Sequence, residues 1–216
     1  MLSFKKVKKK YSNFELNINN IVINEKDFVV VQGKSGSGKS TFLNIAGLLD
    51  KNFNGLYCFD GLDIKSINSF EKAKLRNEKI GFVFQSFNLI PNLSVKDNIL
   101  LPYKYSSKKI NLDYFDKVVK KIEIFHLLDK KIDELSGGEK QRVAFARAII
   151  LEPKYILADE PTGNLDSYNS DIIINELIAY NQEGHTVILI THNEKFYSIG
   201  NRNFILDGGR LYEKTN

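Results

Sequence analysis

A glycine-rich segment between an apolar run and a helical pattern has the residue types that bind phosphate. It reads GKSGSGKST over residues 33–41 and follows the strand-like run 28–31. Glycines let such a loop wrap a phosphate with backbone N–H groups, and the following helix N-terminus adds positive potential. We expect Lys39 to reach the β- and γ-phosphates of a nucleotide and the Ser40 hydroxyl to bind Mg²⁺. The predicted phosphate-binding residues are Gly33, Lys34, Ser35, Gly36, Ser37, Gly38, Lys39, Ser40 and Thr41.

Two carboxylates follow a second apolar run. The segment YILADE occupies residues 155–160 and ends in Asp159 and Glu160. A carboxylate at the carboxyl end of a parallel strand lies in the ligand crevice of an open α/β sheet. Beside a phosphate loop, this placement predicts that Asp159 holds Mg²⁺ and that Glu160 polarises an attacking water.

A serine and two glycines precede a strongly helical segment later in the chain. Residues 135–142 read LSGGEKQR, and the helical pattern runs over 139–151. This arrangement makes a second helix N-terminus suited to an anion. A simple kinase-type protein with a phosphate loop needs only one such anion site. The second site indicates that this protein is of a different type.

These residues resemble the ATP-binding cassette (ABC) ATPase family, whose signature is the segment LSGGEKQR. Other landmarks of the family follow the same order. Gln85 matches the Q-loop, Gly163–Asp166 matches the D-loop and His192 matches the switch histidine. The resemblance covers residues 2 to about 213, which is nearly the whole chain.

The resemblance implies that two ATP molecules are sandwiched in a homodimer that closes when ATP binds. It implies that Glu160 is the general base and that His192 holds the γ-phosphate and the attacking water. Gln85 would contact Mg²⁺ and report to a partner, and Asp166 would tie the two ATP sites together. The residues that would face the ATP of the other subunit are Ser136, Gly137, Gly138 and Glu139.

The family also stacks an aromatic side chain on adenine, some way before the phosphate loop. Tyr11 fits this position best, and Phe14 is the alternative. For Phe14 we favour packing in the core.

The elements that must position these residues alternate along the 216 residues. We predict strands at 28–31, 80–84, 155–158 and 186–190 and a hairpin at 204–212, with helices at 39–49, 112–128, 139–151 and 167–180. Alternating strands and helices predict an α/β fold with a parallel core. The resemblance implies that this core is the P-loop NTPase core of the ABC ATPase fold. An antiparallel β subdomain over 1–23 and an inserted helical subdomain over about 88–135 complete one nucleotide-binding domain, residues 1–216.

The charge and the cysteine content limit the possible partners. The net charge of +5 equals the five lysines among residues 5–10. The remainder balances, which argues against a nucleic-acid-binding protein. We expect this segment to be a solvated edge strand, with contact to an anionic membrane surface as the alternative. The single cysteine, Cys58, excludes an intrachain disulfide and suggests a reducing compartment.

The apolar runs are of strand length, so we expect no transmembrane segment and no signal peptide. The chain is then cytoplasmic and bound peripherally to the inner face of the cell membrane. The segments ADEPTGNLD at residues 158–166 and IGFVFQSFNLIP at residues 80–91 resemble the lipoprotein-release, macrolide-efflux and bacteriocin-export subfamily. The ATPases of that subfamily act on a separate polytopic permease. Export, peptide or lipoprotein release, and mechanotransmission are the implied roles, and a soluble ATPase of the iron–sulfur assembly type is the alternative. The predicted docking surface follows Gln85 and comprises Phe87, Leu89, Ile90, Leu93 and Val95.

Two further histidines lie outside these motifs. We expect His126 to pack in the core and His185 to be solvated. Cys58 is expected to be an inert small hydrophobic residue in a strand.

Overall fold

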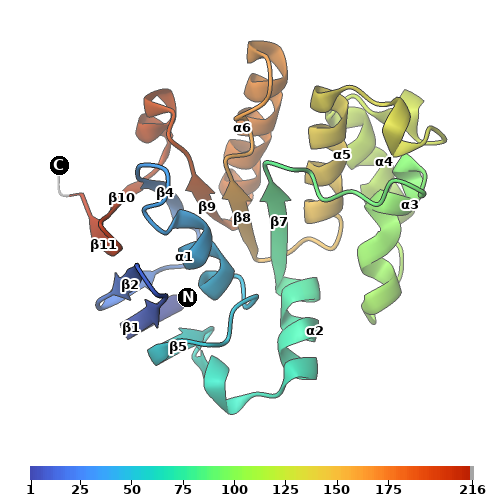
Figure 1. Ribbon diagram of the computed structural model, residues 1–216. Coiled ribbons are helices and arrows are strands. Elements are labelled where there is room, and N and C mark those ends of the chain that lie inside the picture. The colour runs from blue at the N-terminus through green and yellow to red at the C-terminus, as the bar shows by residue number, and fades with distance from the viewer. Residues whose placement is uncertain (215–216) are drawn as a thin grey trace.

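The chain folds around one sheet of mixed direction, seen in a computed structural model that describes residues 1–214 (Figure 1). The strand order is β6-β5-β1-β2-β11-β10-β4-β9-β8-β7, and β3 pairs with β1. The strands are β1 (Leu2–Lys10), β2 (Glu15–Ile18), β3 (Ile21–Ile23), β4 (Phe28–Gln32), β5 (Asn54–Phe59), β6 (Leu62–Asp63), β7 (Ile80–Phe84), β8 (Tyr155–Asp159), β9 (Thr186–Ile190), β10 (Arg202–Asp207) and β11 (Arg210–Glu213).

The parallel core consists of β10, β4, β9, β8 and β7. Its register pairs Phe84 with Asp159, Asp159 with Ile190, and Ile190 with Val31. The carboxyl ends of β7, β8, β9 and β4 therefore reach the same edge of the sheet. The segments that follow these strands contain the predicted phosphate loop and carboxylates, so the register gathers them at one edge.

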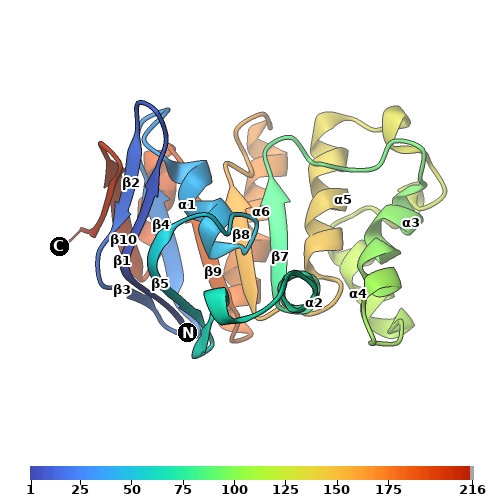
Figure 2. The same ribbon diagram turned by 60° about the horizontal axis from the view of Figure 1, so that its bottom comes forward.

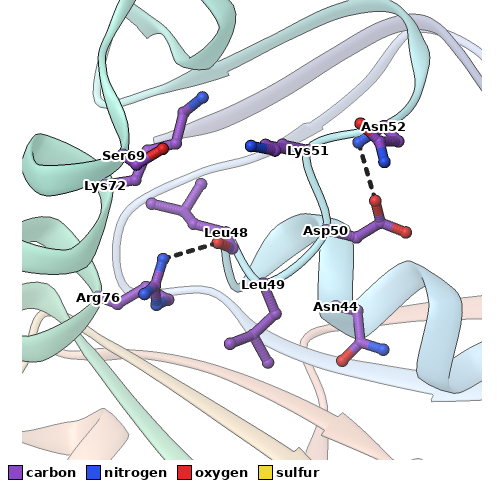
Figure 3. A pocket seen from close by; sticks show the side chains of 9 residues that line it. All are labelled: Asn44, Leu48, Leu49, Asp50, Lys51, Asn52, Ser69, Lys72 and Arg76. Carbon is purple, nitrogen blue, oxygen red and sulfur yellow. Dashed lines mark hydrogen bonds between the residues drawn. The ribbon is translucent and has the colours of Figure 1, made fainter.

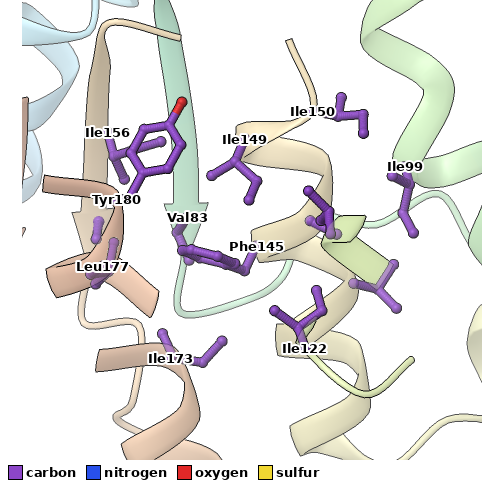
Figure 4. Close-up of a cluster of buried hydrophobic side chains, with 14 of the residues drawn as sticks. Val83, Ile99, Ile122, Phe145, Ile149, Ile150, Ile156, Ile173, Leu177 and Tyr180 are labelled. Atoms are coloured by element: carbon purple, nitrogen blue, oxygen red, sulfur yellow. The ribbon is translucent and has the colours of Figure 1, made fainter. Parts of the chain in front are cut away.

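Helices cover both faces of this core, which explains why its strands are continuous apolar runs. Val29 and Val31 of β4 face one hydrophobic cluster, and Phe28 and Val30 face the other. Figure 4 shows the second cluster, in which Phe145 lies between the sheet and its covering helices. The helices are α1 (Lys39–Ala46), α2 (Ser69–Lys79), α3 (Val95–Leu100), α4 (Leu112–Lys121), α5 (Gly137–Ile149) and α6 (Ser167–Gln182).

The antiparallel part of the sheet corrects one expectation about the lysine-rich segment. Strand β1 is no edge strand, because β2 and β3 pair with it on one side and β5 on the other. Its apolar residues Leu2, Phe4 and Val7 are buried, and most of its lysines face solvent. The lysines are thus solvated as predicted. The cause is the alternation of inward and outward side chains along the strand, and not the protection of a free sheet edge.

A mostly helical segment lies beside β7, on the side away from the antiparallel strands (Figure 2). It contains α3, α4 and 3₁₀ turns at Leu101–Tyr105, Phe125–Leu127 and Ile132–Glu134. The predicted helix over 112–128 is too long. It ends at Lys121 because Glu123 adopts a left-handed conformation with φ of 60°. In the same way α1 ends at Ala46, before Leu48 with φ of 60°, rather than at Leu49.

The assignment of all 216 residues to one domain stays a prediction. Its last two positions, 215 and 216, lie outside the described residues.

Candidate active site

The phosphate loop connects β4 to α1 and is held in shape by its glycines. Gly36 and Gly38 have φ of 77° and 106°, a region that disfavours other residues. A Cβ atom at Gly33 would come within 2.4 Å of the Leu206 carbonyl oxygen, so the loop needs glycine there too. The Lys39 amine donates hydrogen bonds to the carbonyl oxygens of Gly33 (2.7 Å) and Lys34 (3.1 Å). The amine is thereby kept over the concave side of the loop.

A cavity of about 460 Å³ opens in front of this loop. It gathers most of the predicted nucleotide-binding residues with both carboxylates. Gly33, Lys34 and Ser37 are not among its lining residues, and Ser37 is buried. The lining residues are Tyr11, Phe14, Ser35, Gly36, Gly38, Lys39, Ser40, Thr41, Gln85, Asp159 and Glu160.

Oxygen atoms suited to a divalent cation converge at one side of the cavity. The Ser40 hydroxyl donates to Oδ2 of Asp159 over 3.2 Å, and the Gln85 side chain lines the same space. Burial and the neighbouring Glu160 charge raise the pKa of Asp159, whereas the Ser40 hydrogen bond lowers it. Within residues 1–214 no cluster of three or more His, Cys, Asp or Glu could hold a metal alone. Few protein oxygens, completed by water and phosphate, are the usual environment of Mg²⁺.

Glu160 lies between the phosphate-loop lysine and a histidine from the neighbouring strand. Its Oε2 is 2.5 Å from Nδ1 of His192, and its Oε1 is 3.8 Å from Nζ of Lys39. The Glu160 backbone has φ of 48° and its N–H donates to the Ile190 carbonyl, which turns the side chain over the end of β8. The site therefore pairs a shielded carboxylate with an accessible imidazole, because their side chains are 15% and 69% exposed.

Gln85 contacts the D-loop segment, residues 163–166, and Asp166 ends it. The Gln85 amide is 3.5 Å from Oδ1 of Asn164, and it lies so near Gly163 that a Cβ there would approach to 2.9 Å. Asp166 caps α6 by accepting a hydrogen bond from the Asn169 N–H over 2.7 Å. The backbone and side-chain hydrogen bonds of Asn169 lower the pKa of Asp166. Asp166 does not line the cavity that contains Glu160.

The signature segment forms the N-terminus of α5. Ser136 caps the helix, and its N–H and hydroxyl donate to Oε2 of Glu139 over 2.7 and 2.8 Å. These bonds lower the pKa of Glu139. The pattern Ser-x-x-Glu is a capping box that the sequence could have revealed. Glu139 thus holds the cap, and none of residues 136–139 lines the phosphate-loop cavity.

The two candidate aromatic residues differ in exposure. Tyr11 is 46% exposed at the cavity rim, with the Lys9 amine 5.3 Å from its ring centre. Phe14 packs on the loop itself, since a Cβ at Gly38 would come 2.4 Å from its ring. The adenine contact of Tyr11 stays a prediction, and the packing role favoured for Phe14 is what the structure contains.

Three residues outside the site differ from expectation. His126 is exposed rather than packed, because the helix predicted to bury it has already ended. His185 is half-buried rather than solvated: its ring stacks on Tyr180 at 3.9 Å between ring centres, and its Nδ1 lies 2.9 Å from the Pro153 carbonyl oxygen. Val95 is fully buried in the helical segment, so it belongs to no docking surface.

Two other cavities lie along α2. The first, about 460 Å³, is lined by residues of α1, of the segment after it and of α2, including Asp50, Lys51 and Arg76 (Figure 3). The second, about 420 Å³, is more apolar and lies beside β7. Sequence reasoning missed this apolar cleft. Its lining residues are Leu49, Ala73, Arg76, Asn77, Ile80, Gly81, Phe82, Phe84, Pro102, Tyr105, Arg147 and Ala148.

The similarity to known proteins agrees with this geometry. The family described as "ABC transporter" matches residues 16–163. The macrolide export ATP-binding/permease protein MacB of Campylobacter jejuni is 43% identical over 195 residues, which cover 89% of this chain and 30% of MacB. The uncharacterized ABC transporter ATP-binding protein YknY of Bacillus subtilis is 44% identical over 191 residues, covering 88% of this chain and 83% of YknY. This chain therefore spans about a third of MacB but most of YknY.

Solved structures resemble the whole fold. The dimeric ABC transporter cassette MJ0796 has a TM-score of 0.89 and 37% identity, with 100% of this chain and 98% of that chain covered. A second dimeric MJ0796 structure, in a post-hydrolysis state with ADP and Pi, has a TM-score of 0.89 and 36% identity over the same coverage. Among the described residues of this chain, no helix is long and apolar enough to cross a bilayer.

Proposed function

The chain belongs to the ABC transporter family and carries its ATPase domain, and on that premise we propose that it is the subunit whose ATP hydrolysis drives a separate membrane protein. The observation that carries the proposal is the single cavity in which Lys39, Ser40, Asp159 and Glu160 meet. These groups could bind a nucleotide's phosphates, hold a cation and activate water.

In this proposal the loop amides and Lys39 hold the β- and γ-phosphates. The oxygens of Ser40, Asp159 and Gln85 fit Mg²⁺, which would neutralise charge on the phosphates when bound. Glu160 accepts a proton from the attacking water. His192, hydrogen-bonded to Glu160, orients that water and contacts the γ-phosphate. Phosphoryl transfer depends mainly on such positioning and on charge stabilisation.

The proposal includes an ATP-dependent homodimer. The N-terminus of α5, with Ser136–Glu139, lines no part of the phosphate-loop cavity. An anion-binding helix end outside the chain's own cavity is accounted for if it faces the ATP of a second copy. The dimeric structures of the similar cassette MJ0796 support this arrangement.

We place the membrane partner at the apolar cleft beside β7. Phe82, Phe84 and Tyr105 line it, and Tyr105 is 72% exposed. Arg147 also lines the cleft and donates a hydrogen bond to the Phe87 carbonyl oxygen, which places the segment after Gln85 next to it. The proposed docking surface therefore still includes Phe87, Leu89, Ile90 and Leu93. The printed names of similar proteins, an export ATP-binding/permease protein among them, favour a polytopic permease engaged in export or release. The chain would then work in the cytoplasm, at the inner face of the membrane.

The test is co-purification from the native cell. Tagged Glu160→Gln protein, purified from solubilised membranes with ATP, should retain a polytopic membrane protein in fixed ratio. Recovery of soluble partners alone would contradict the proposal. The same protein purified without ATP serves as the control for nucleotide dependence.

A further inference from the structure

Asn169 links two functional segments that lie far apart in the sequence. It is in the first turn of α6, just after the D-loop aspartate. Its side-chain amide donates to both carboxylate oxygens of Asp166, over 2.9 and 2.8 Å. Its own N–H donates to Oδ1 of Asp166 over 2.7 Å. Three hydrogen bonds from two donor groups of one residue thus fix the direction of this carboxylate.

The opposite edge of the same amide accepts a hydrogen bond from Arg142 of α5. Arg142 is only 8% exposed, and its Nε has no hydrogen-bond partner among the described residues. A buried guanidinium is costly unless it is paired. Asn169 therefore connects the buried cation of the signature helix to the exposed carboxylate of the D-loop without direct contact between the charges.

Packing strengthens the link. A Cβ atom at Gly138 would lie 2.3 Å from Cγ of Asn169, so the amide rests directly on the signature glycine. Gly138 is predicted to face the ATP of the second subunit, and Asp166 to tie the two ATP sites together. Asn169 touches both residues, and a shift of α5 relative to the D-loop would break the hydrogen bond between Arg142 and Asn169.

We propose that Asn169 is a positioning residue that locks the Asp166 carboxylate to the N-terminus of α5, so that both reach the second subunit as one preformed surface. The inference rests on the ATP-dependent dimer of the proposed function. A preformed surface lowers the entropy cost of association, so loss of the link weakens the closed dimer more than it weakens ATP binding to one chain.

The test replaces Asn169 by Asp in a Glu160→Gln background. The new carboxylate keeps the shape and still accepts from Arg142, but it has no donor for Asp166 and repels it. From the helix dipole alone, Asn169→Asp should stabilise α6, because the first turn of α6 contains no acidic residue and an acidic residue there stabilises a helix. A loss of dimer affinity in this variant would therefore not result from a less stable helix. Asn175→Asp is the matched control, since Asn175 is an exposed residue of the same helix.

Dimer formation with ATP is measured by light scattering across protein concentrations, and ATP binding to the monomer by a fluorescent analogue at low concentration. We expect Asn169→Asp to raise the dimer dissociation constant about tenfold, the effect of losing a charge-assisted hydrogen bond. Monomer affinity for the analogue should change less than about twofold. Asn175→Asp should behave as the parent.

Asn169→Thr is the second variant, because its hydroxyl can still donate to Asp166, and it should keep the constant within about threefold of the parent. An unchanged constant for Asn169→Asp, or an equal loss for Asn169→Thr, would overturn the inference. If Asn169→Asp fails to fold, as circular dichroism would reveal, Asn169→Ala takes its place, and an unchanged dimer dissociation constant for that variant would overturn the inference. If the Glu160→Gln parent itself forms no dimer with ATP, the proposed dimer is wrong, and the inference falls with it.

Discussion

Nδ1 of His192 lies 2.5 Å from Oε2 of Glu160, and the two side chains come from the ends of adjacent strands, β9 and β8. The pair needs no second subunit to form, so each chain already holds the two groups that we propose to activate water. The imidazole is the exposed member and the carboxylate the shielded one. His192 can therefore meet a γ-phosphate while Glu160 stays fixed behind it.

The first prediction concerns this histidine. His192→Ala should lower the turnover number for ATP about tenfold or more, because the attacking water loses its orientation. The KM for ATP should change little, since the phosphates stay on the loop. His126→Ala, at an exposed histidine outside the site, is the control. Steady-state kinetics with both variants check the prediction, and equal turnover of the two would refute it.

The second prediction separates the two aromatic residues near the phosphate loop. Tyr11→Ala should weaken ATP binding about two- to tenfold, the value of one aromatic stack, and leave the melting temperature unchanged. Phe14→Ala should instead lower the melting temperature, because its ring packs on Gly38. Calorimetric titration and thermal unfolding of both variants distinguish these effects. A Phe14→Ala protein that is stable but has lost its affinity for ATP would show that Phe14, and not Tyr11, contacts the adenine.

The third prediction concerns acid stability. Burial alone would raise the pKa of Asp60, but hydrogen bonds from Lys154, the Met1 amine and Tyr155 outweigh it, and the pKa falls to about 2. A carboxyl with a lowered folded-state pKa stabilises the fold above its unfolded pKa, near 3.8, and loses that effect as the pH falls toward 2.

Asp60→Asn should therefore lower the free energy of unfolding at pH 7, with the difference from the unchanged protein shrinking between about pH 4 and pH 2. Urea unfolding at a series of pH values measures it. A difference that is constant over this range would show that the carboxylate charge is not the cause.

The fourth prediction tests the docking cleft. Tyr105→Glu should abolish co-purification of the membrane partner while ATP binding persists, because a charge in an apolar contact is costly to bury. Tyr212→Glu is the matched control: Tyr212 is 47% exposed on β11, outside the cleft. Partner recovery with Tyr105→Glu equal to that of the control would place the docking surface elsewhere.

The sequence predicted the parallel core well, because strands buried on both faces form continuous apolar runs such as 28–31 and 186–190. It missed α2, which buries none of its residues completely and so leaves no apolar period to read. The capping box of Asn68 and Glu71 was the available signal. The ends of α1 and α4 depend on single left-handed residues that no periodicity reveals.

The candidate site also has parts that the sequence predicts and parts that only the structure reveals. Its phosphate loop and carboxylates are contiguous motifs, and the sheet register brings them together. The contact of Arg142 with Asn169 joins residues 27 positions apart on two helices, and only their packing reveals it. Leu89 and Val95 both look apolar in the sequence, yet Val95 is completely buried and Leu89 only partly. Exposure depends on the tertiary fold, so the docking surface could be predicted only in outline.

The most direct measurement compares ATP hydrolysis by the unchanged protein and by Glu160→Gln, with Mg²⁺ present. Glu183→Gln, an exposed residue at the end of α6, is the control. We predict a hydrolysis rate about 10²- to 10⁴-fold lower for Glu160→Gln, as expected for loss of a general base, with ATP still bound. The Glu183→Gln rate should match that of the unchanged protein. Equal rates for the unchanged protein and Glu160→Gln would contradict the assignment of Glu160 and of the cavity as the hydrolytic site.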